Sequence, residues 1–300
     1  MPAEFRIGKL FHVTPLVDDL GAAELFYDSV FSPLCMMRNY AAHWHRDAAI
    51  YVVADASIEP MQCYPPREGE VASSWYRYQE RFGPRVHNTA FYVDDPDALD
   101  RRLRDAGVRT TDGGTGGTGT VFAHPKDTPG MLEFSVPNLW HARDPRFSPH
   151  WKEFAQDFWG NRHPLGVQRL SHITVVVSDH AAARAFFVDV LDSVALDTQA
   201  STVEHADASF VLVGEDTVME LAQPTDVASP VASVLDQVGQ CVVGMTFTIR
   251  DIEQASEHLA LCEAPVLATT DHDIRLDASK TWNTEYRFTE RVLAGDPRLG

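Results

Sequence analysis

LFHVTPLVDDLGAAELFYDSVF (residues 10–31) and LSHITVVVSDHAAARAFFVDVL (residues 170–191) are two copies of one pattern. The copies align without a gap at an offset of 160 residues. In each copy an apolar strand leads to a turn at Asp19 or Asp179, and then to a helix whose apolar residues recur at i, i+3 and i+4. Internal similarity of this kind is typical of folds built from repeated units, so we expect the chain to contain two related halves.

A weaker copy follows each strong one. Residues 86–108 (VHNTAFYVDDPDALDRRLRDAGV) and residues 243–264 (VGMTFTIRDIEQASEHLALCEA) again read as a strand, an aspartate and a helix. The fourth copy has Gly244 where the other three carry a histidine. Short β-like runs after each helix complete four units, at roughly 7–66, 83–138, 169–224 and 240–290. The predicted fold is α+β, with four βαβββ modules forming two pseudo-symmetric halves with curved mixed sheets.

The units divide the chain into two predicted domains. Residues 1–138 form the first and residues 169–300 form the second. Between them, residues 139–168 are rich in Trp, His and Pro. Disordered linkers rarely carry so many aromatic residues, so we expect an ordered linker that packs across both halves.

The charge balance excludes several classes of partner. Lys and Arg number 25 against 43 Asp and Glu, a net charge of −18, which repels nucleic acid and anionic membranes. The chain has no secretory signal pattern and no apolar run of roughly 18 residues that could span a membrane. Its four cysteines form no CxxC pair. We expect a cytoplasmic protein with a small-molecule substrate and neither a nucleic-acid nor a membrane partner, and a homodimer stays open.

Two stretches of the first half carry a family resemblance. They are PPREGEVASSWYRYQERFGPRVHNTAFYV (residues 65–93) and VFAHPKDTPGMLEFSVP (residues 121–137). With the repeat, they make the chain resemble the vicinal oxygen chelate superfamily, which includes glyoxalase I, methylmalonyl-CoA epimerase, extradiol dioxygenases and bleomycin-binding resistance proteins. The N-terminal half most resembles methylmalonyl-CoA epimerase. The resemblance implies that two βαβββ units pair into a curved sheet that cups one metal ion.

Carried over residue by residue, the resemblance implies four metal ligands, which are His12, Gln62, His87 and Glu133. It also places Asp47 near the catalytic base of the epimerases, where Glu is expected, and a loosened Glu133 could share that role. Without the family, two imidazoles and a carboxylate suit one divalent ion among Co, Ni, Mn, Zn and Fe. An ion with open positions acts as a Lewis acid on a carbonyl oxygen.

The remaining polar residues are weaker candidates. His43 and His45 either line a substrate pocket or belong to an edge, and Lys126 either contacts an anionic group or is solvated. The glycine-rich run 112–120 lacks the GK[ST] ending of a phosphate loop, which favours a hairpin over the cup. The second half keeps only His172, Glu220 and Glu285 as donors, so we expect a degenerate site there.

Three functions are compatible with these residues. The first is a metal-dependent isomerase, epimerase or lyase, in which the metal stabilises an enolate oxygen and a carboxylate moves the α-proton. The second is an Fe(II) extradiol-type ring-cleavage dioxygenase, although that family places its iron in the C-terminal pair of units, where Gly244 supplies no ligand. The third is a metal-free protein that binds a small molecule. Metal content discriminates among them.

Overall fold

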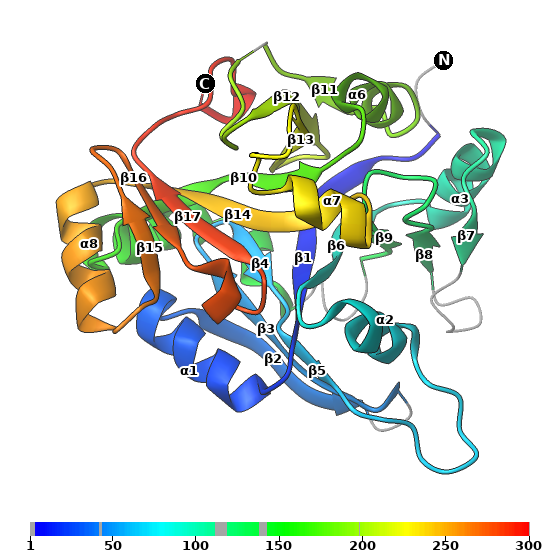
Figure 1. Ribbon diagram of the computed structural model, residues 1–300, viewed down its shortest axis with the longest axis horizontal. Helices are drawn as coiled ribbons and strands as arrows, with labels where there is room; N and C mark the ends of the chain where they lie inside the picture. The colour runs from blue at the N-terminus through cyan, green and yellow to red at the C-terminus, as the bar shows by residue number, and fades with distance from the viewer. Residues whose placement is uncertain (1–3, 42–43, 112–118, 138–142, 198, 300) are drawn as a thin grey trace.

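The computed structural model describes residues 4–41, 44–111, 119–137, 143–197 and 199–299. Its described residues form the four predicted βαβββ-like units, two in each half, and each half builds one mixed sheet (Figure 1). No helix in the described part is both long enough and apolar enough to cross a membrane.

The N-terminal sheet is built from two units. The first contains β1 (Ile7–Val17), α1 (Leu20–Phe31), β2 (Leu34–Ala41), β3 (Arg46–Val53), β4 (Ala56–Ile58) and β5 (Met61–Cys63). After α2 (Ser74–Phe82), the second contains β6 (Val86–Val93), α3 (Pro96–Asp105), β7 (Thr110–Thr111), β8 (Thr120–Ala123) and β9 (Leu132–Ser135). The closing strand of the first unit is interrupted at Pro60, which has no amide proton to donate to the sheet.

The C-terminal sheet repeats this plan. Its first unit contains β10 (Val167–Val176), α6 (His180–Asp189), β11 (Val194–Ala195), β12 (Ala206–Val213) and β13 (Thr217–Pro224). After α7 (Ala232–Val238), its second unit contains β14 (Cys241–Ile249), α8 (Ile252–Leu261), β15 (Val266–Thr269), β16 (Asp273–Leu276) and β17 (Glu285–Thr289). The segment between the halves holds the short helix α5 (Trp151–Ala155) and a π-helical turn, η3 (Gln156–Arg162).

The strand register shows that the two halves are equivalent. In each sheet the first strand lies antiparallel to the first strand of the next unit and parallel to its own unit's closing strand. His12 on β1 is opposite Ala90, and His172 on β10 is opposite Thr246. These two histidines therefore occupy the same place in the two halves, as the repeat predicted.

One aspartate begins the long helix of every unit. Asp19, Asp95, Asp179 and Asp251 each accept a hydrogen bond from a backbone amide of the first turn. Such N-caps satisfy amides that have no partner within the helix. The aspartates that recur in the sequence thus fix where each helix starts.

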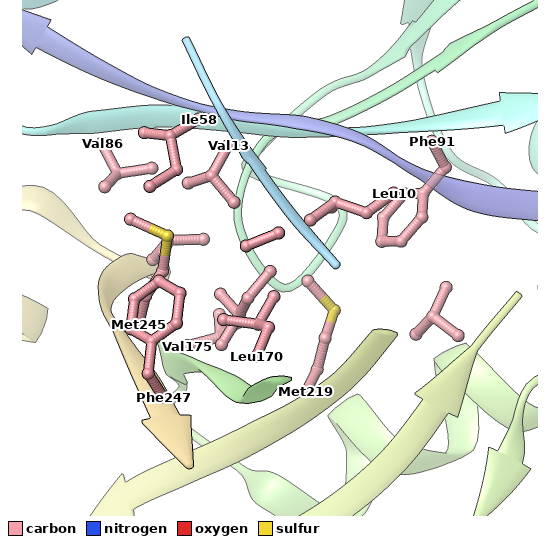
Figure 2. Close-up of a cluster of buried hydrophobic side chains, with 14 of the residues drawn as sticks. Leu10, Val13, Ile58, Val86, Phe91, Leu170, Val175, Met219, Met245 and Phe247 are labelled. Carbon is pink, nitrogen blue, oxygen red and sulfur yellow. The ribbon is translucent and has the colours of Figure 1, made fainter. Parts of the chain in front are cut away.

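The two sheets share one hydrophobic core. Figure 2 shows side chains of the first half facing those of the second across it. The labelled residues are Leu10, Val13, Ile58, Val86 and Phe91 from the first half, and Leu170, Val175, Met219, Met245 and Phe247 from the second. Trp159 of η3 is buried in this core and donates to the Phe31 carbonyl at 2.9 Å. The segment between the halves is therefore ordered and packed where it is described.

A reciprocal pair of aspartates joins the halves. Asp55 accepts from the Leu170 amide at 2.6 Å, and the equivalent Asp216 accepts from the Leu10 amide at 2.9 Å. The sequence Asp-Pro-Arg occurs at residues 144–146 and again at 296–298, and its arginine contacts the first strand of a half in both cases. Arg146 donates to the Leu10 carbonyl on β1, and Arg298 donates to the Leu170 carbonyl on β10. The halves are thus fixed to each other by matching polar contacts beside the shared core.

Candidate functional site

A belt of polar side chains crosses the face of the N-terminal sheet that lies away from α1 and α3. We call it the polar belt, and its members are His12, Thr14, Glu59, Asn88, Glu133 and Ser135. It separates two small apolar clusters on the same face, one formed by Phe11, Ile50, Ala90 and Tyr92 and the other by Leu16, Ala48, Met61 and Cys63. Polar groups gathered in this way across an apolar sheet face make the belt the best candidate for a site.

His12 and Glu59 form the centre of the belt. Both are 4% exposed, and His12 Nδ1 lies 3.3 Å from Glu59 Oε2 and 2.9 Å from the Thr14 hydroxyl. The other ring nitrogen of His12, Nε2, has no hydrogen-bond partner among the described residues. In this arrangement Nε2 is the ring nitrogen of His12 that is left available to a ligand.

Glu133 brings a second carboxylate to the belt. It accepts hydrogen bonds from Asn88 Nδ2 at 2.8 Å and from the Ser135 hydroxyl at 3.3 Å. Burial raises the pKa of Glu133, and the negative charge of Glu59 adds to the rise, while His12 and Arg46 oppose it. A carboxylate with a raised pKa can accept a proton at a pH nearer neutrality.

Arg46 closes one side of the belt. Its guanidinium lies 4.8 Å from the ring centroid of Trp44 and 4.7 Å from that of Trp75, and its Nη1 lies 3.9 Å from Glu59 Oε1. Stacking of a guanidinium on two aromatic rings holds it in place by cation–π attraction. The belt therefore borders a fixed positive charge.

His87 lies beside the belt, not within it. Thr14 is opposite Asn88 whereas Pro15 is opposite Val86, so His87 is an extra residue at a break in the strand register. Its ring packs edge-on against Tyr78 at 4.9 Å, and its Nδ1 lies 2.9 Å from Asn88 Oδ1. Burial lowers the pKa of His87 to about 4, which keeps the ring neutral.

A cavity of about 580 Å³ opens next to the belt. Its lining residues are Trp44, Val71, Ala72, Ser73, Ser74, Trp75, Arg77, His87, Thr111, Phe122, His124, Pro125 and Met131. Within the described part of the chain none of them is acidic, although the protein carries 43 acidic residues. The size and the aromatic walls suit a small organic molecule.

Several predicted site residues lie elsewhere. Gln62 turns to the helix-covered face, where its Oε1 accepts from the Leu20 amide at 3.0 Å. Asp47 pairs with Arg38, which also pairs with Glu24 of α1 at 2.5 Å. Thus Gln62 and Asp47 do not converge with His12 and Glu133. Among the described residues no three His, Cys, Asp or Glu side chains are arranged as a ready metal site.

The weaker candidates also lie outside the belt. His45 pairs with Glu70 at 2.6 Å and is not among the cavity-lining residues. Lys126 is exposed, although its neighbours His124 and Pro125 line the cavity. His43 and residues 112–118 of the glycine-rich run lie outside the described residues.

Sequence reasoning missed Glu59, Asn88 and Arg46. Glu59 is the true counterpart of Glu220, which sits at the same register on β13. The signal was present, because Glu-x-x-Gln occurs at Glu59–Gln62 and again at Glu220–Gln223. Both glutamines accept from the first amide of the long helix of their own unit. Gln62 therefore lies three residues beyond the position that is equivalent to Glu220.

Comparisons with known proteins match this architecture. The profile of the family described as glyoxalase-like domain matches residues 12–191, more than half of the chain. A profile described as glyoxalase/bleomycin resistance protein/dioxygenase superfamily matches residues 171–279. The chain belongs to this superfamily, also called vicinal oxygen chelate. No curated protein sequence matches this vicinal oxygen chelate protein.

Two of the similar solved structures show the same two-half fold. A mutant of 4-hydroxymandelate synthase from Streptomyces coelicolor has 15% identity and a TM-score of 0.69, covering 96% of this chain and 95% of the other. A fusion of a xylose isomerase-like TIM barrel with 4-hydroxyphenylpyruvate dioxygenase has 12% identity and a TM-score of 0.61, covering 100% of this chain and 51% of the fusion. Methylmalonyl-CoA epimerase from Mycobacterium tuberculosis has 27% identity and a TM-score of 0.39, covering 47% of this chain and 97% of the epimerase.

Vicinal oxygen chelate proteins commonly bind divalent metal ions, and the polar belt fits one by the chemistry of its donors. His12 offers a free ring nitrogen, Glu59 is a buried carboxylate, and the pKa of the half-buried Glu133 is raised by desolvation and, to a smaller extent, by repulsion from Glu59. A divalent cation would relieve this repulsion, and imidazole with carboxylate oxygen suits several transition metals. The Asn88 amide is the nearest further donor, since it already contacts Glu133.

In the C-terminal half, the polar side chains at the equivalent positions are already hydrogen-bonded within the protein. Glu220 accepts from the hydroxyls of Thr174 and Ser201 and from both the amide and the hydroxyl of Thr202. Both ring nitrogens of His172 have partners, and these contacts hold the pKa of Glu220 to about 2 in spite of its burial.

Two further donor positions of this second belt are lost. The register places Gly244 where the first half has Asn88, so the predicted equivalence of Gly244 with His87 was off by one residue. It places Arg287, not Glu285, where the first half has Glu133. Arg287 donates to the Thr202 carbonyl and helps to hold the 201–203 segment over the site. The two halves of this vicinal oxygen chelate protein are therefore alike in fold and different in site chemistry.

Proposed function

We propose that this chain is a divalent-metal-dependent enzyme whose site is the polar belt of its N-terminal half. His12, Glu59 and Glu133 would hold the ion, and the adjoining cavity would hold a small substrate with a planar or aromatic part. The observation that carries the proposal is one free imidazole nitrogen, on His12, and two carboxylates, the buried Glu59 and the half-buried Glu133, that influence each other's charge beside an aromatic cavity of about 580 Å³.

The residues suggest how such a site works. A bound divalent ion would supply a Lewis acid for a substrate oxygen, and in the case of iron(II) also a position for O₂. Glu133, loosened from the ion, would accept a proton from the substrate carbon next to a carbonyl group. Arg46 would hold an anionic substrate oxygen, and the walls formed by Trp44 and Trp75 would exclude water. These roles favour an isomerase, epimerase or lyase.

A second candidate is an Fe(II)-dependent dioxygenase. It is supported by the likeness of the whole fold to 4-hydroxymandelate synthase and to the fusion that contains 4-hydroxyphenylpyruvate dioxygenase, and these comparisons favour it over proton transfer. The donor set favours proton transfer, because the belt holds one histidine whereas the iron(II) oxygenase set has two. His87 would have to turn from Tyr78 toward the belt to complete that set.

Turnover assays separate the candidates. The protein would be loaded with Co, Ni, Mn or Zn, or with Fe(II) under argon, and offered catechols, aromatic 2-oxo acids and thioesters. Exchange of substrate hydrogen for solvent deuterium without O₂ uptake would support proton transfer, and Glu133→Gln should then reduce the rate by about 10²–10⁴-fold. O₂ uptake with iron alone would support the dioxygenase. Tight binding without turnover for every metal would overturn both and indicate a binding protein.

A further inference from the structure

The C-terminal half contains a cavity that the polar belt does not explain. It has a volume of about 280 Å³, just below the usual range of ligand pockets, so a small ligand fits it. One wall is apolar and consists of Val203, Val231, Val234, Val242 and Met245. The belt of this half is already bonded within the protein and has lost donors. We therefore consider this cavity separately from any metal site.

Glu285 is the unusual polar group of this cavity. Its carboxylate forms no hydrogen bond and no ion pair with any described residue. It lies on β17 directly opposite Gly244, where an added Cβ would meet the Glu285 carbonyl oxygen at 2.5 Å. Glycine at this position therefore lets β17 approach β14 closely at Glu285. A largely dehydrated carboxylate without a partner is costly, so a ligand that donates to it is favoured.

Two arginines line the same cavity. Arg275 is close enough to act on the charge of Glu285, yet its nearest carboxylate within ion-pair range is the exposed Glu204, at 4.0 Å. Arg85 comes from the N-terminal half, where its Nε donates to the Phe82 carbonyl at 2.9 Å. The cavity thus presents a carboxylate and guanidinium groups that do not pair with each other, together with an apolar wall.

We propose that this cavity binds a small zwitterion with an apolar side chain, an α-amino acid of the aliphatic or aromatic class. The ligand's ammonium group would donate to Glu285, its carboxylate would lie against Arg275 and Arg85, and its side chain would pack on the valine wall. A carboxylate and a guanidinium form strong charge-assisted hydrogen bonds, and the apolar wall adds affinity in proportion to the area it buries. The site is independent of the function proposed for the polar belt.

Ligand selectivity of the unaltered protein tests the class directly. Isothermal titration would compare leucine, methionine and phenylalanine with isoamylamine, which lacks the carboxylate, and with 4-methylpentanoate, which lacks the ammonium group. At least one amino acid should bind at least about 10-fold more tightly than both analogues, since each analogue loses one charge-assisted contact. Equal binding of an amino acid and either analogue would overturn the zwitterion assignment. No binding of any amino acid at 10 mM, about the weakest useful affinity, would overturn the site.

Variants then assign the contacts. Glu285→Gln and Arg275→Gln should each weaken binding by about 10-fold or more. Glu204→Gln is the matched control, because this exposed glutamate also neighbours Arg275 but does not line the cavity. Its binding should equal that of the parent. Unchanged binding in Glu285→Gln, or an equal loss in Glu204→Gln, would contradict the proposal.

Discussion

Replacing Asp55 with Asn should make the stability of the protein less dependent on pH. The Asp55 carboxylate accepts a hydrogen bond from Leu170 across the two halves, and its removal from water raises its pKa from 3.8 to about 6. The folded chain therefore keeps a proton on this group at pH values where the unfolded chain has released it. The resulting stabilisation is fully present below the unfolded pKa and is lost as the pH rises through 6.

The size of the effect follows from the shift. A difference of about 2 pKa units corresponds to about 3 kcal/mol in the free energy of unfolding, and about half of this change falls between pH 5 and pH 8. Asn keeps the oxygen that accepts from Leu170 but does not titrate. Urea unfolding at pH 5, 6, 7 and 8 should show the parent losing about 1–2 kcal/mol more than Asp55→Asn over this range. An equal pH dependence in the two proteins would refute the reasoning.

Three further substitutions have defined outcomes. Arg146→Leu should lower the free energy of unfolding by about 3–5 kcal/mol, because it leaves the buried Asp144 without its ion pair, and adding Asp144→Asn should recover part of the loss. Gly244→Ala should cost about 1–3 kcal/mol through the clash with the Glu285 carbonyl, and unfolding at the parent's urea midpoint would contradict that contact. Activity of the N-terminal site should fall in acid, because protonation of Glu133 removes a ligand and the proposed base together, and Glu133→Gln should be about 10²–10⁴-fold slower than the parent at neutral pH.

Because of the repeat, the fold could be predicted from the sequence. The 160-residue offset preserves both the strand pattern and the aspartates that cap the helices, such as Asp19 and Asp179, so local chemistry and long-range order agree. The boundaries of the four units follow from that agreement. His12 and His172 could be placed in equivalent strands for the same reason.

The site was less predictable because side-chain direction depends on register. Pro60 interrupts the closing strand, so the register beyond it could not be fixed from the sequence. The sequence therefore placed Gln62 on the face that carries the polar belt, where the structure has Glu59. A register break on β6 placed Asn88 in the belt and His87 beside it, and a single sequence does not show such an irregularity. The role of Arg46 depends on Trp75, which is distant in sequence and comes from a helix between units.

The metal content of four purified proteins tests the central claim most directly. The parent, His12→Ala, Glu59→Gln and His172→Ala would be prepared without chelator, dialysed against the same divalent ions and measured by mass spectrometry of the metal. The parent and His172→Ala should retain about one ion per chain, because both nitrogens of His172 are already bonded within the protein. His12→Ala and Glu59→Gln should lose most of it. Full retention in His12→Ala together with loss in His172→Ala would contradict the account and place the metal in the C-terminal half.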